Sequence, residues 1–192
     1  LGGQQASQAL LSHKLIKGIS FVGSTPVAKY IYEEGSRHKK RVQALGGAKN
    51  FMVVLPDALT NDTVSTCVES VIGCAGQRCL AGSVIIGVGD AYEKLKPQIL
   101  EHARNIKTGN GMNEETTMGP LISKQAVLRV KDLIQSGVDQ GAELLLDGRC
   151  NSHGYYLAPS VFAGVSSSMR IAQEEIFGPV ICLGFAPTLK DA

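Results

Sequence analysis

Short apolar runs rich in β-branched residues alternate with segments of helical periodicity along this chain. One such run, Gly18–Val22, ends at Gly23 and is followed by a helical pattern over residues 27–34. Pro26 stands at the first turn of that helix, where a backbone N–H would have no helical partner. A strand, a tight turn and a helix in this order form the unit from which sheets with parallel strands are built. We therefore expect an α/β fold with largely parallel pairing.

The same alternation predicts the remaining elements. Further strands are expected at 51–55, 83–88, 142–146, 160–162 and 180–185, and further helices at 4–11, 61–72, 91–106 and 123–141. Thr60 or Asp62 is expected to cap the helix at 61–72. In the helix at 123–141, five apolar residues recur at helical spacing and predict its buried face: Val127, Val130, Leu133, Ile134 and Val138.

Composition excludes several classes of protein. The 192 residues, 44% of them hydrophobic, are enough for one or two domains with a core. The net charge of +2 is spread along the chain, and the basic cluster at 37–41 lacks interleaved aromatic residues, so we expect no nucleic-acid binding. Gly, Lys or Glu interrupts each apolar run within about ten residues, short of the roughly 20 that a membrane-spanning helix needs. We expect a soluble protein without a membrane segment.

The five cysteines are scattered, without the paired spacing of zinc sites or a dense disulfide pattern: Cys67, Cys74, Cys79, Cys150 and Cys182. We expect free thiols in a reducing compartment. The four histidines show no metal-ligand spacing either, and each stands in a polar stretch: His13, His38, His102 and His153. We therefore expect no metal site and assign the histidines no role.

The small-residue loop at 73–80 is the first candidate for chemistry, because it places a thiol beside a guanidinium. Arg78 directly precedes Cys79, and a nearby positive charge favours the thiolate form that acts as a nucleophile. Cys79 is thus a candidate nucleophile, although a free cysteine is more often a small buried hydrophobe. Cys67, on the helix before the loop, is assigned to the core.

Two further segments could hold parts of a nucleotide. Ser24 follows a strand and stands at a helix N-terminus, where backbone N–H groups and a hydroxyl can bind phosphate. An ordinary helix cap explains the same residue. Glu174 and Glu175 precede the sequence Ile-Phe-Gly-Pro and could bind ribose hydroxyls, whereas an isolated pair of glutamates is more often a solvated surface.

Taken in order, five segments resemble the aldehyde dehydrogenase superfamily. They are ISFVGSTPVAK, the GGAKN turn at 46–50, GQRC, a TxxGPLI loop at 116–122 and EEIFGPV. SFVGS, GSRHKKRVQALGGAKN and GQRC are most similar to its methylmalonate-semialdehyde dehydrogenase branch, which makes acyl-CoA instead of free acid. The resemblance covers essentially the whole chain. It implies the aldehyde dehydrogenase fold, with residues 1–47 as the end of the Rossmann-like NAD-binding domain and residues 48–192 as most of the α/β catalytic domain.

The resemblance also implies roles for single residues. Cys79 matches the nucleophile that attacks the aldehyde carbon to form a thiohemiacetal, which becomes a thioester when its hydride passes to the nicotinamide. Arg78 matches an arginine that meets the substrate carboxylate in this branch. Four residues match contacts of NAD: Ser24 at the pyrophosphate, Val27 beside the adenine, Glu175 at the nicotinamide ribose and Phe177 packed next to it.

One departure from the family pattern bears on the product. Hydrolytic members carry E-L-G-G-K, and alignment on Lys49 puts Leu45 in the place of that Glu. The base that activates the deacylating water is then missing, and no motif supports Glu33, Glu34 or Glu69 as its substitute. Attack by the thiol of coenzyme A needs less help from a base, so this departure favours coenzyme A as a co-substrate.

Three hypotheses about function follow. The first is NAD-dependent oxidation of methylmalonate or malonate semialdehyde to propionyl-CoA or acetyl-CoA, with release of CO₂. The second is a hydrolytic, succinate-type semialdehyde dehydrogenase, and the third is a non-catalytic relative of the fold, against which Cys79, Ser24 and Glu175 argue. The chain lacks an initial Met, so we expect a fragment of a longer enzyme. By analogy we expect a homo-oligomer, a dimer or tetramer, in the bacterial cytoplasm or the mitochondrial matrix.

Overall fold

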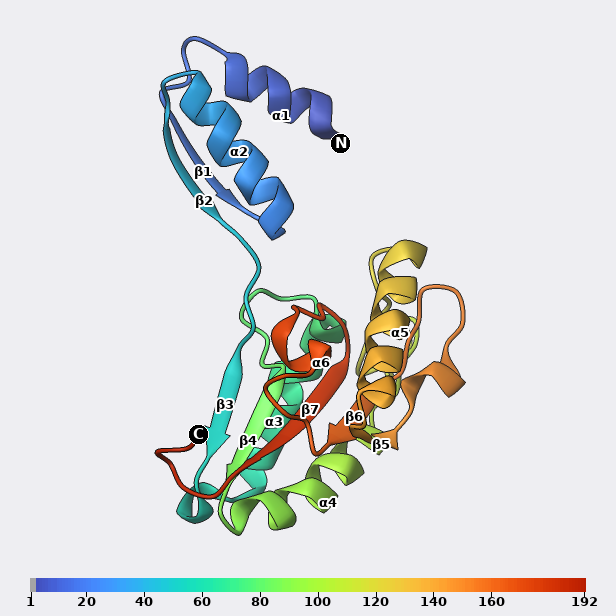
Figure 1. The fold of residues 1–192 in the computed structure, drawn as a ribbon. Coiled ribbons are helices and arrows are strands. Elements are labelled where there is room, and N and C mark those ends of the chain that lie inside the picture. Colours follow the sequence, from blue (N-terminus) through green and yellow to red (C-terminus); the bar gives the residue numbers. More distant parts are fainter. Residues whose placement is uncertain (1–2) are drawn as a thin grey trace. The chain divides into compact units, whose positions relative to one another are not determined.

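The computed structural model describes residues 3–192, which divide after Ala48 into two compact units (Figure 1). The second unit spans Lys49–Ala192. The expected α/β class is confirmed, since both units combine helices with parallel strands. The assignment of residues 1–47 and 48–192 to the cofactor-binding and catalytic domains stays a prediction.

The first unit is a βαβ unit preceded by a helix. Its elements are α1 (Gly3–Ser12), β1 (Gly18–Val22), α2 (Thr25–Arg37) and β2 (Arg41–Leu45). The strands β1 and β2 pair in parallel along their whole length. Helix α2 packs so closely on them that a Cβ atom at Gly35 would lie 2.7 Å from Cγ2 of Val42 and 3.1 Å from Cδ1 of Ile19. The absence of a side chain at Gly35 therefore allows the helix to approach the two strands.

The second unit is built on a five-stranded sheet. Its strands are β3 (Phe51–Val54), β4 (Val84–Val88), β5 (Glu143–Leu146), β6 (Ser160–Ala163) and β7 (Val180–Ala186). Its helices are α3 (Asn61–Ile72), α4 (Ala91–Arg104), α5 (Lys124–Asp139) and α6 (Arg170–Gln173), with short 3₁₀ turns η1 (Pro56–Ala58), η2 (Gly73–Gly76) and η3 (Gly148–Asn151). The strand order is β3-β4-β7-β6-β5, and every pair is parallel except β5–β6. None of the helices among residues 3–192 is both long enough and apolar enough to cross a membrane.

Two helices of the second unit begin where a hydroxyl side chain caps them. Thr60 accepts a hydrogen bond from the backbone N–H of Thr63, so Thr60, and not Asp62, caps α3. Ser123 caps α5 in the same way through the N–H of Ala126. Each cap satisfies an N–H group that lacks a helical partner, and the helix begins at the next residue.

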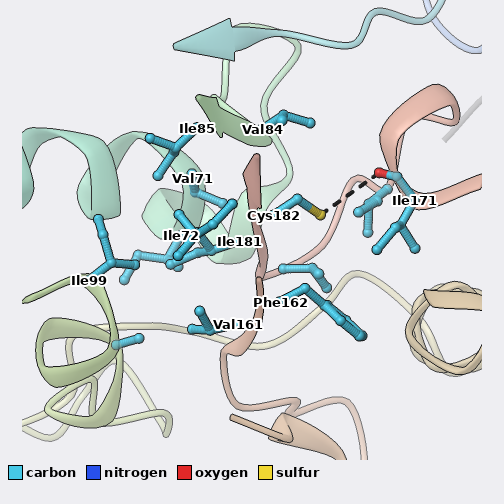
Figure 2. Packing of buried hydrophobic residues seen from close by; sticks show 14 of the residues in the cluster. Val71, Ile72, Val84, Ile85, Ile99, Val161, Phe162, Ile171, Ile181 and Cys182 are labelled. Carbon is cyan, nitrogen blue, oxygen red and sulfur yellow. Dashed lines mark hydrogen bonds between the residues drawn. The ribbon is translucent and has the colours of Figure 1, made fainter. Parts of the chain in front are cut away.

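The core of the second unit lies around the inner strands of the sheet (Figure 2). These strands carry nearly continuous apolar runs, as expected where both faces are covered, and Ile85, Ile181 and Phe162 are fully buried. Four of the five apolar residues predicted for the buried face of α5 are buried, whereas Val138, in its last turn, is exposed. Gly137 is buried in its stead, where a Cβ atom would lie 2.8 Å from Cδ1 of Ile171 and 3.1 Å from the ring of Phe162.

Candidate functional site

Cys79, the predicted nucleophile, lies in an exposed turn after α3. Its backbone carbonyl accepts a hydrogen bond of 2.8 Å from Nδ2 of Asn50, and the same amide donates to the carbonyl of Ala81 at 2.9 Å. One side chain from the GGAKN segment therefore holds this turn on both sides of Leu80. Cys79 itself stays exposed, as a thiol that meets a substrate must be.

Two of the other cysteines are buried and two are exposed. Cys67 lies in the core as predicted, and Cys182 on β7 is fully buried, with its thiol directed at the carbonyl of Ile171 (Figure 2). Burial raises the pKa of both thiols, that of Cys182 to about 11, so both are protonated at neutral pH. Cys74 and Cys150 are exposed, and all of these thiols are free, as predicted.

The loop before Cys79 has an unusual backbone. Cys74, Ala75 and Gly76 have φ angles of 54°, 55° and 72°, in the left-handed region, which costs a residue with a side chain about 1–2 kcal/mol. A Cβ atom at Gly76 would lie 2.2 Å from the carbonyl oxygen of Gly178. The loop therefore touches the EEIFGPV segment directly, and this contact requires glycine at position 76. Backbone strain of this kind is concentrated at functional sites.

Gln77 joins this loop to the TxxGPLI loop. Its Nε2 donates to the carbonyls of Cys74 at 3.1 Å and Pro120 at 3.2 Å, and its Oε1 accepts from the backbone N–H of Ile122 at 2.8 Å. One amide side chain thus connects two segments that are 43 residues apart in sequence.

Arg78 is bound to the end of α3. Its Nη2 donates to the carbonyls of Glu69 and Ser70, both at 3.1 Å. A Cβ atom at Gly73 would lie only 2.4 Å from this nitrogen. A cation at this position satisfies terminal carbonyls and interacts favourably with the helix dipole. The contact of Arg78 with a substrate carboxylate stays a prediction, and Nε and Nη1, which bond no other described residue, are the donors left for it.

The two glutamates of the EEIFGPV segment have different surroundings. The carboxylate of Glu174 pairs with Arg170, which also binds Asp132 at 2.8 Å. Glu175 is half-buried, and its carboxylate forms no hydrogen bond or ion pair with another residue of the described chain. Phe177 has a φ angle of 51° and keeps 39% of its surface exposed. Of the pair, Glu175 is therefore the residue whose carboxylate is free to accept bonds from a ligand.

Two cations hold the backbone of the same segment. Nζ of Lys49 donates to the carbonyl of Glu174 at 2.8 Å. Arg129, on α5, donates from Nη1 to the carbonyl of Glu175 at 3.0 Å and from Nη2 to that of Ile176. Burial lowers the pKa of Lys49, and interactions with Cys182, Glu175 and Glu174 oppose this effect.

Sequence reasoning assigns no role to four residues that build this site. Lys49, Asn50 and Gln77 belong to segments that carry the family resemblance, and that membership is the signal that could have identified them. Arg129 belongs to none of these segments and lies on an exposed part of α5, where an arginine is typical of a solvated surface.

A cavity of about 560 Å³ lies where these segments meet. It is lined by residues of the thiol loop, the TxxGPLI loop and the EEIFGPV segment, together with one tyrosine: Cys74, Gln77, Pro120, Leu121, Ile122, Tyr155 and Phe177. Its volume and its mixture of aromatic, aliphatic and amide groups are typical of sites for small molecules. The structure thus brings three of the predicted segments together. Cys79, Arg78 and Glu175 belong to these segments but do not line the cavity.

In the first unit, Ser24 and Val27 are exposed at the beginning of α2. Ser24 is the N-cap residue of α2, and its side chain makes no capping hydrogen bond. Oγ1 of Thr25 accepts a bond of 3.0 Å from the N–H of Gly47. The hydroxyl of Ser24 bonds no other residue of the part of the chain that the structure describes, and it stands at a helix N-terminus, a position suited to phosphate. Leu45 ends β2 with its side chain half-exposed.

The histidines take no part in the candidate site. All four are exposed. His38 pairs with Glu34 on α2, and His153 stacks on Tyr156. Over the described range 3–192, no three His, Cys, Asp or Glu side chains are grouped as a metal site requires.

A family model described as the aldehyde dehydrogenase family matches residues 1–192. Malonate-semialdehyde dehydrogenase of Pseudomonas aeruginosa is 44% identical over 201 residues, which cover 100% of this chain and 40% of that protein. The human mitochondrial methylmalonate-semialdehyde/malonate-semialdehyde dehydrogenase, described as acylating, is 43% identical over 196 residues, which cover 100% of this chain and 36% of that protein. The chain thus spans about 40% of the length of the curated relatives it matches.

Solved structures give the same result. Methylmalonate-semialdehyde dehydrogenase of Oceanimonas doudoroffii superposes with a TM-score of 0.94 at 37% identity, over 98% of this chain and 40% of that one. A Sinorhizobium meliloti protein described as a methylmalonate-semialdehyde dehydrogenase, in complex with NAD, superposes with a TM-score of 0.93 at 36% identity, over 97% of this chain and 39% of that one. These likenesses confirm the fold that the sequence resemblance implied.

Proposed function

Because the chain belongs to the aldehyde dehydrogenase family, we propose that it is part of an NAD-dependent enzyme that oxidises methylmalonate or malonate semialdehyde to propionyl-CoA or acetyl-CoA and CO₂. The observation that carries this proposal is the meeting of the GQRC, TxxGPLI and EEIFGPV segments at one cavity, with Cys79 exposed in the first of them. Relatives of 44% and 43% identity are named for these semialdehydes, which supports the substrate class.

The residues present fit the binding of NAD. Ser24 offers a free hydroxyl at a helix N-terminus for the pyrophosphate, and Val27 offers an exposed apolar surface for the adenine. Glu175 offers the nicotinamide ribose a carboxylate that no other residue among 3–192 binds, and Phe177 offers a ring at the cavity. When bound, NAD supplies the acceptor for the hydride.

Cys79 performs the covalent step of the proposed reaction. Its sulfur attacks the aldehyde carbon, so that a C–S bond forms while the carbonyl electron pair moves to oxygen and the thiol proton leaves to solvent. Loss of hydride from this thiohemiacetal restores the C=O bond and leaves a thioester on Cys79. Asn50 orients the turn for this attack, because its amide holds the carbonyl of Cys79 itself and that of Ala81, two residues further on. Arg78 pairs with the substrate carboxylate through its remaining donors.

Coenzyme A then takes the acyl group. Its thiolate attacks the thioester carbon, and the sulfur of Cys79 leaves. The carboxylate of the substrate is bonded to the carbon next to the thioester carbonyl, so this C–C bond can break with release of CO₂. The electron pair of that bond forms an enolate with the thioester carbonyl, and a proton from solvent then adds to the α carbon. Leu45 stands where hydrolytic relatives have a Glu and offers no base for water, which favours the thiol as the attacking group.

The assembly and the compartment belong to the same proposal. We propose a homo-oligomer, a dimer or tetramer, that works in the bacterial cytoplasm or in the mitochondrial matrix. Bacterial relatives and a human mitochondrial relative support these two compartments. Sedimentation of the full-length protein measures the assembly state.

The deciding experiment is an assay of NADH formation by the full-length protein. Methylmalonate, malonate and succinate semialdehydes are compared with and without coenzyme A, with NAD and NADP, and the acyl product is identified by mass spectrometry. We expect propionyl-CoA and acetyl-CoA from the first two substrates with NAD. Free succinate as the main product would support the hydrolytic alternative, and no NADH from any aldehyde would support a non-catalytic relative.

A further inference from the structure

Three successive backbone carbonyls of the EEIFGPV segment accept hydrogen bonds from cationic side chains. Lys49 binds the first, that of Glu174, at 2.8 Å. Arg129 binds the next two, those of Glu175 and Ile176, through its two terminal nitrogens. The segment between α6 and β7 is thus fixed through its main chain at the residues that lead to Phe177.

The arrangement uses a property that arginine has and lysine lacks. The guanidinium is a planar fork, so two of its N–H groups can bind two carbonyls at once and fix their relative orientation. Hydrogen bonds from a charged donor are roughly twice as strong as neutral ones. The next residue, Phe177, has a left-handed φ angle of 51°, a conformation that is maintained only where the surroundings hold it.

Helix α5, which carries Arg129, packs against the core of the second unit. Its buried face includes Val127 and Val130, on either side of Arg129 in sequence. A Cβ atom at Gly178 would lie 2.5 Å from Cγ2 of Val130, so the helix also touches the segment just beyond Phe177. The packing of α5 therefore sets the backbone position of Arg129, and from there its side chain reaches the carbonyls of Glu175 and Ile176.

We propose that Arg129 is a positioning residue for cofactor binding. By holding the carbonyls of Glu175 and Ile176, it directs the carboxylate of Glu175 and the ring of Phe177 toward the nicotinamide end of NAD. This inference rests on the proposed function, in which those two side chains contact the cofactor. Arg129 acts on nucleotide affinity through Glu175 and Phe177, and it leaves the chemistry of Cys79 untouched.

The test compares Arg129→Gln, Arg129→Lys and a matched control, Lys124→Gln, in the full-length protein. Lys124 is an exposed residue in the first turn of the same helix, and its side chain has no ion pair with another described residue. NADH binding is measured by fluorescence titration, and KM for NAD and kcat by assay. We expect Arg129→Gln to raise Kd and KM about tenfold, which is about 1.4 kcal/mol. Arg129→Lys is expected to recover part of this loss and Lys124→Gln to show none.

A double-mutant cycle with Glu175→Gln tests the route of the effect. If Arg129 acts by directing Glu175, its replacement costs clearly less affinity in the Glu175→Gln background than in the wild type. Equal losses in both backgrounds would overturn that route, and wild-type affinity of Arg129→Gln would overturn the proposal. If the Gln variant does not fold, Arg129→Lys, which keeps the charge, replaces it in the cycle, and wild-type affinity of the Lys variant would then overturn the proposal.

Failure of the positioning role of Arg129 can be distinguished from failure of the proposed function. A wild-type protein that binds NADH but oxidises no semialdehyde contradicts the proposed function, whereas the binding titrations of the Arg129 variants still decide the positioning role. A wild-type protein that binds no nicotinamide nucleotide contradicts both.

Discussion

The side-chain amide of Asn50 donates to the carbonyl of Cys79 at 2.8 Å and to that of Ala81 at 2.9 Å. The backbone carbonyl of Asn50 in turn accepts from the N–H groups of Ser83, at 3.1 Å, and Val84, at 3.3 Å. Asn50 stands directly before β3, and Val84 begins β4. The exposed turn that carries the thiol is thereby attached to the sheet, and Cys79, the proposed nucleophile, is held in position without being buried.

Replacement of Asn50 is expected to loosen this turn. Asn50→Ala removes two hydrogen bonds, each worth about 0.5–1.5 kcal/mol, so we expect a loss of about 1–3 kcal/mol in the free energy of unfolding and a lower kcat. Asn50→Asp is expected to be worse, because a carboxylate would face two carbonyl oxygens. Urea unfolding and kcat are measured beside Asn61→Ala, an exposed control. Wild-type kcat in both Asn50 variants would contradict the positioning role.

Gly76 is expected to tolerate no side chain. Gly76→Ala places a Cβ atom 2.2 Å from the carbonyl oxygen of Gly178 and puts alanine at a φ angle of 72°. Overpacking costs about 1–3 kcal/mol and the left-handed conformation about 1–2 kcal/mol more. We expect a lower melting temperature and a large loss of activity. Gly111→Ala, at a position with open space around it, is the control, and equal behaviour of the two variants would show that the loops do not meet as described.

Cys79→Ala is expected to abolish turnover while NAD affinity stays nearly unchanged. Loss of covalent catalysis costs several kcal/mol, and each 1.4 kcal/mol is about tenfold in rate, so less than about 1% of the activity should remain. Activity assays and NADH titrations are made beside Cys150→Ala, another exposed cysteine. An active Cys79→Ala variant with an inactive Cys74→Ala variant would move the nucleophile to Cys74.

Local patterns were sufficient to predict most of the fold. Helix α3 was predicted at its observed residues, because Thr60 is a capping residue and Gly73 interrupts the helical pattern. The apolar runs of β4, β6 and β7 identified the inner strands, since buried parallel strands need apolar residues on both faces. The antiparallel pairing of β5 with β6 depends on contacts between segments distant in sequence, which no local pattern encodes.

The candidate site was predictable only in part, for the same reason. The resemblance pointed to Cys79 and, of the two glutamates, to Glu175. In the structure Glu174 is paired with Arg170, whereas the carboxylate of Glu175 bonds no other residue of the described range 3–192. Arg129 is 46 residues from Glu175 in sequence. An arginine on an exposed part of a helix has no local signal that separates a solvated charge from one that binds a distant loop, so its role required the fold.

Arg78→Leu is expected to discriminate between substrates. Loss of a charge-assisted pair should lower kcat/KM for carboxylate-bearing semialdehydes, by an amount that corresponds to about 2–4 kcal/mol of transition-state stabilisation. The kcat/KM for propanal, which has no carboxylate, should not change. The bonds from Nη2 to Glu69 and Ser70 also disappear, so the melting temperature is measured to separate a stability effect. Arg78→Lys, which keeps the charge, is the control. Equal losses on both kinds of aldehyde would instead indicate that Arg78 stabilises the thiolate of Cys79.

The last prediction concerns deacylation and depends on Leu45. Without a carboxylate at this position, water should attack the Cys79 thioester slowly, so rapid mixing of the full-length protein with NAD and semialdehyde should give a burst of NADH near one per active site. A slow phase should follow, and coenzyme A should accelerate it. Leu45→Glu is expected to raise the rate of free-acid formation, because it restores the base that hydrolytic relatives carry.

Leu45→Gln is the matched control, since it supplies a polar side chain of the same length as Glu without a base. Stopped-flow absorbance of NADH and quantification of the acid and acyl-CoA products provide the measurements. An apolar environment around the new carboxyl would raise its pKa and move the rate gain of Leu45→Glu to higher pH. Rapid release of free acid by the wild-type protein without coenzyme A would contradict the acylating assignment and leave the hydrolytic alternative in its place.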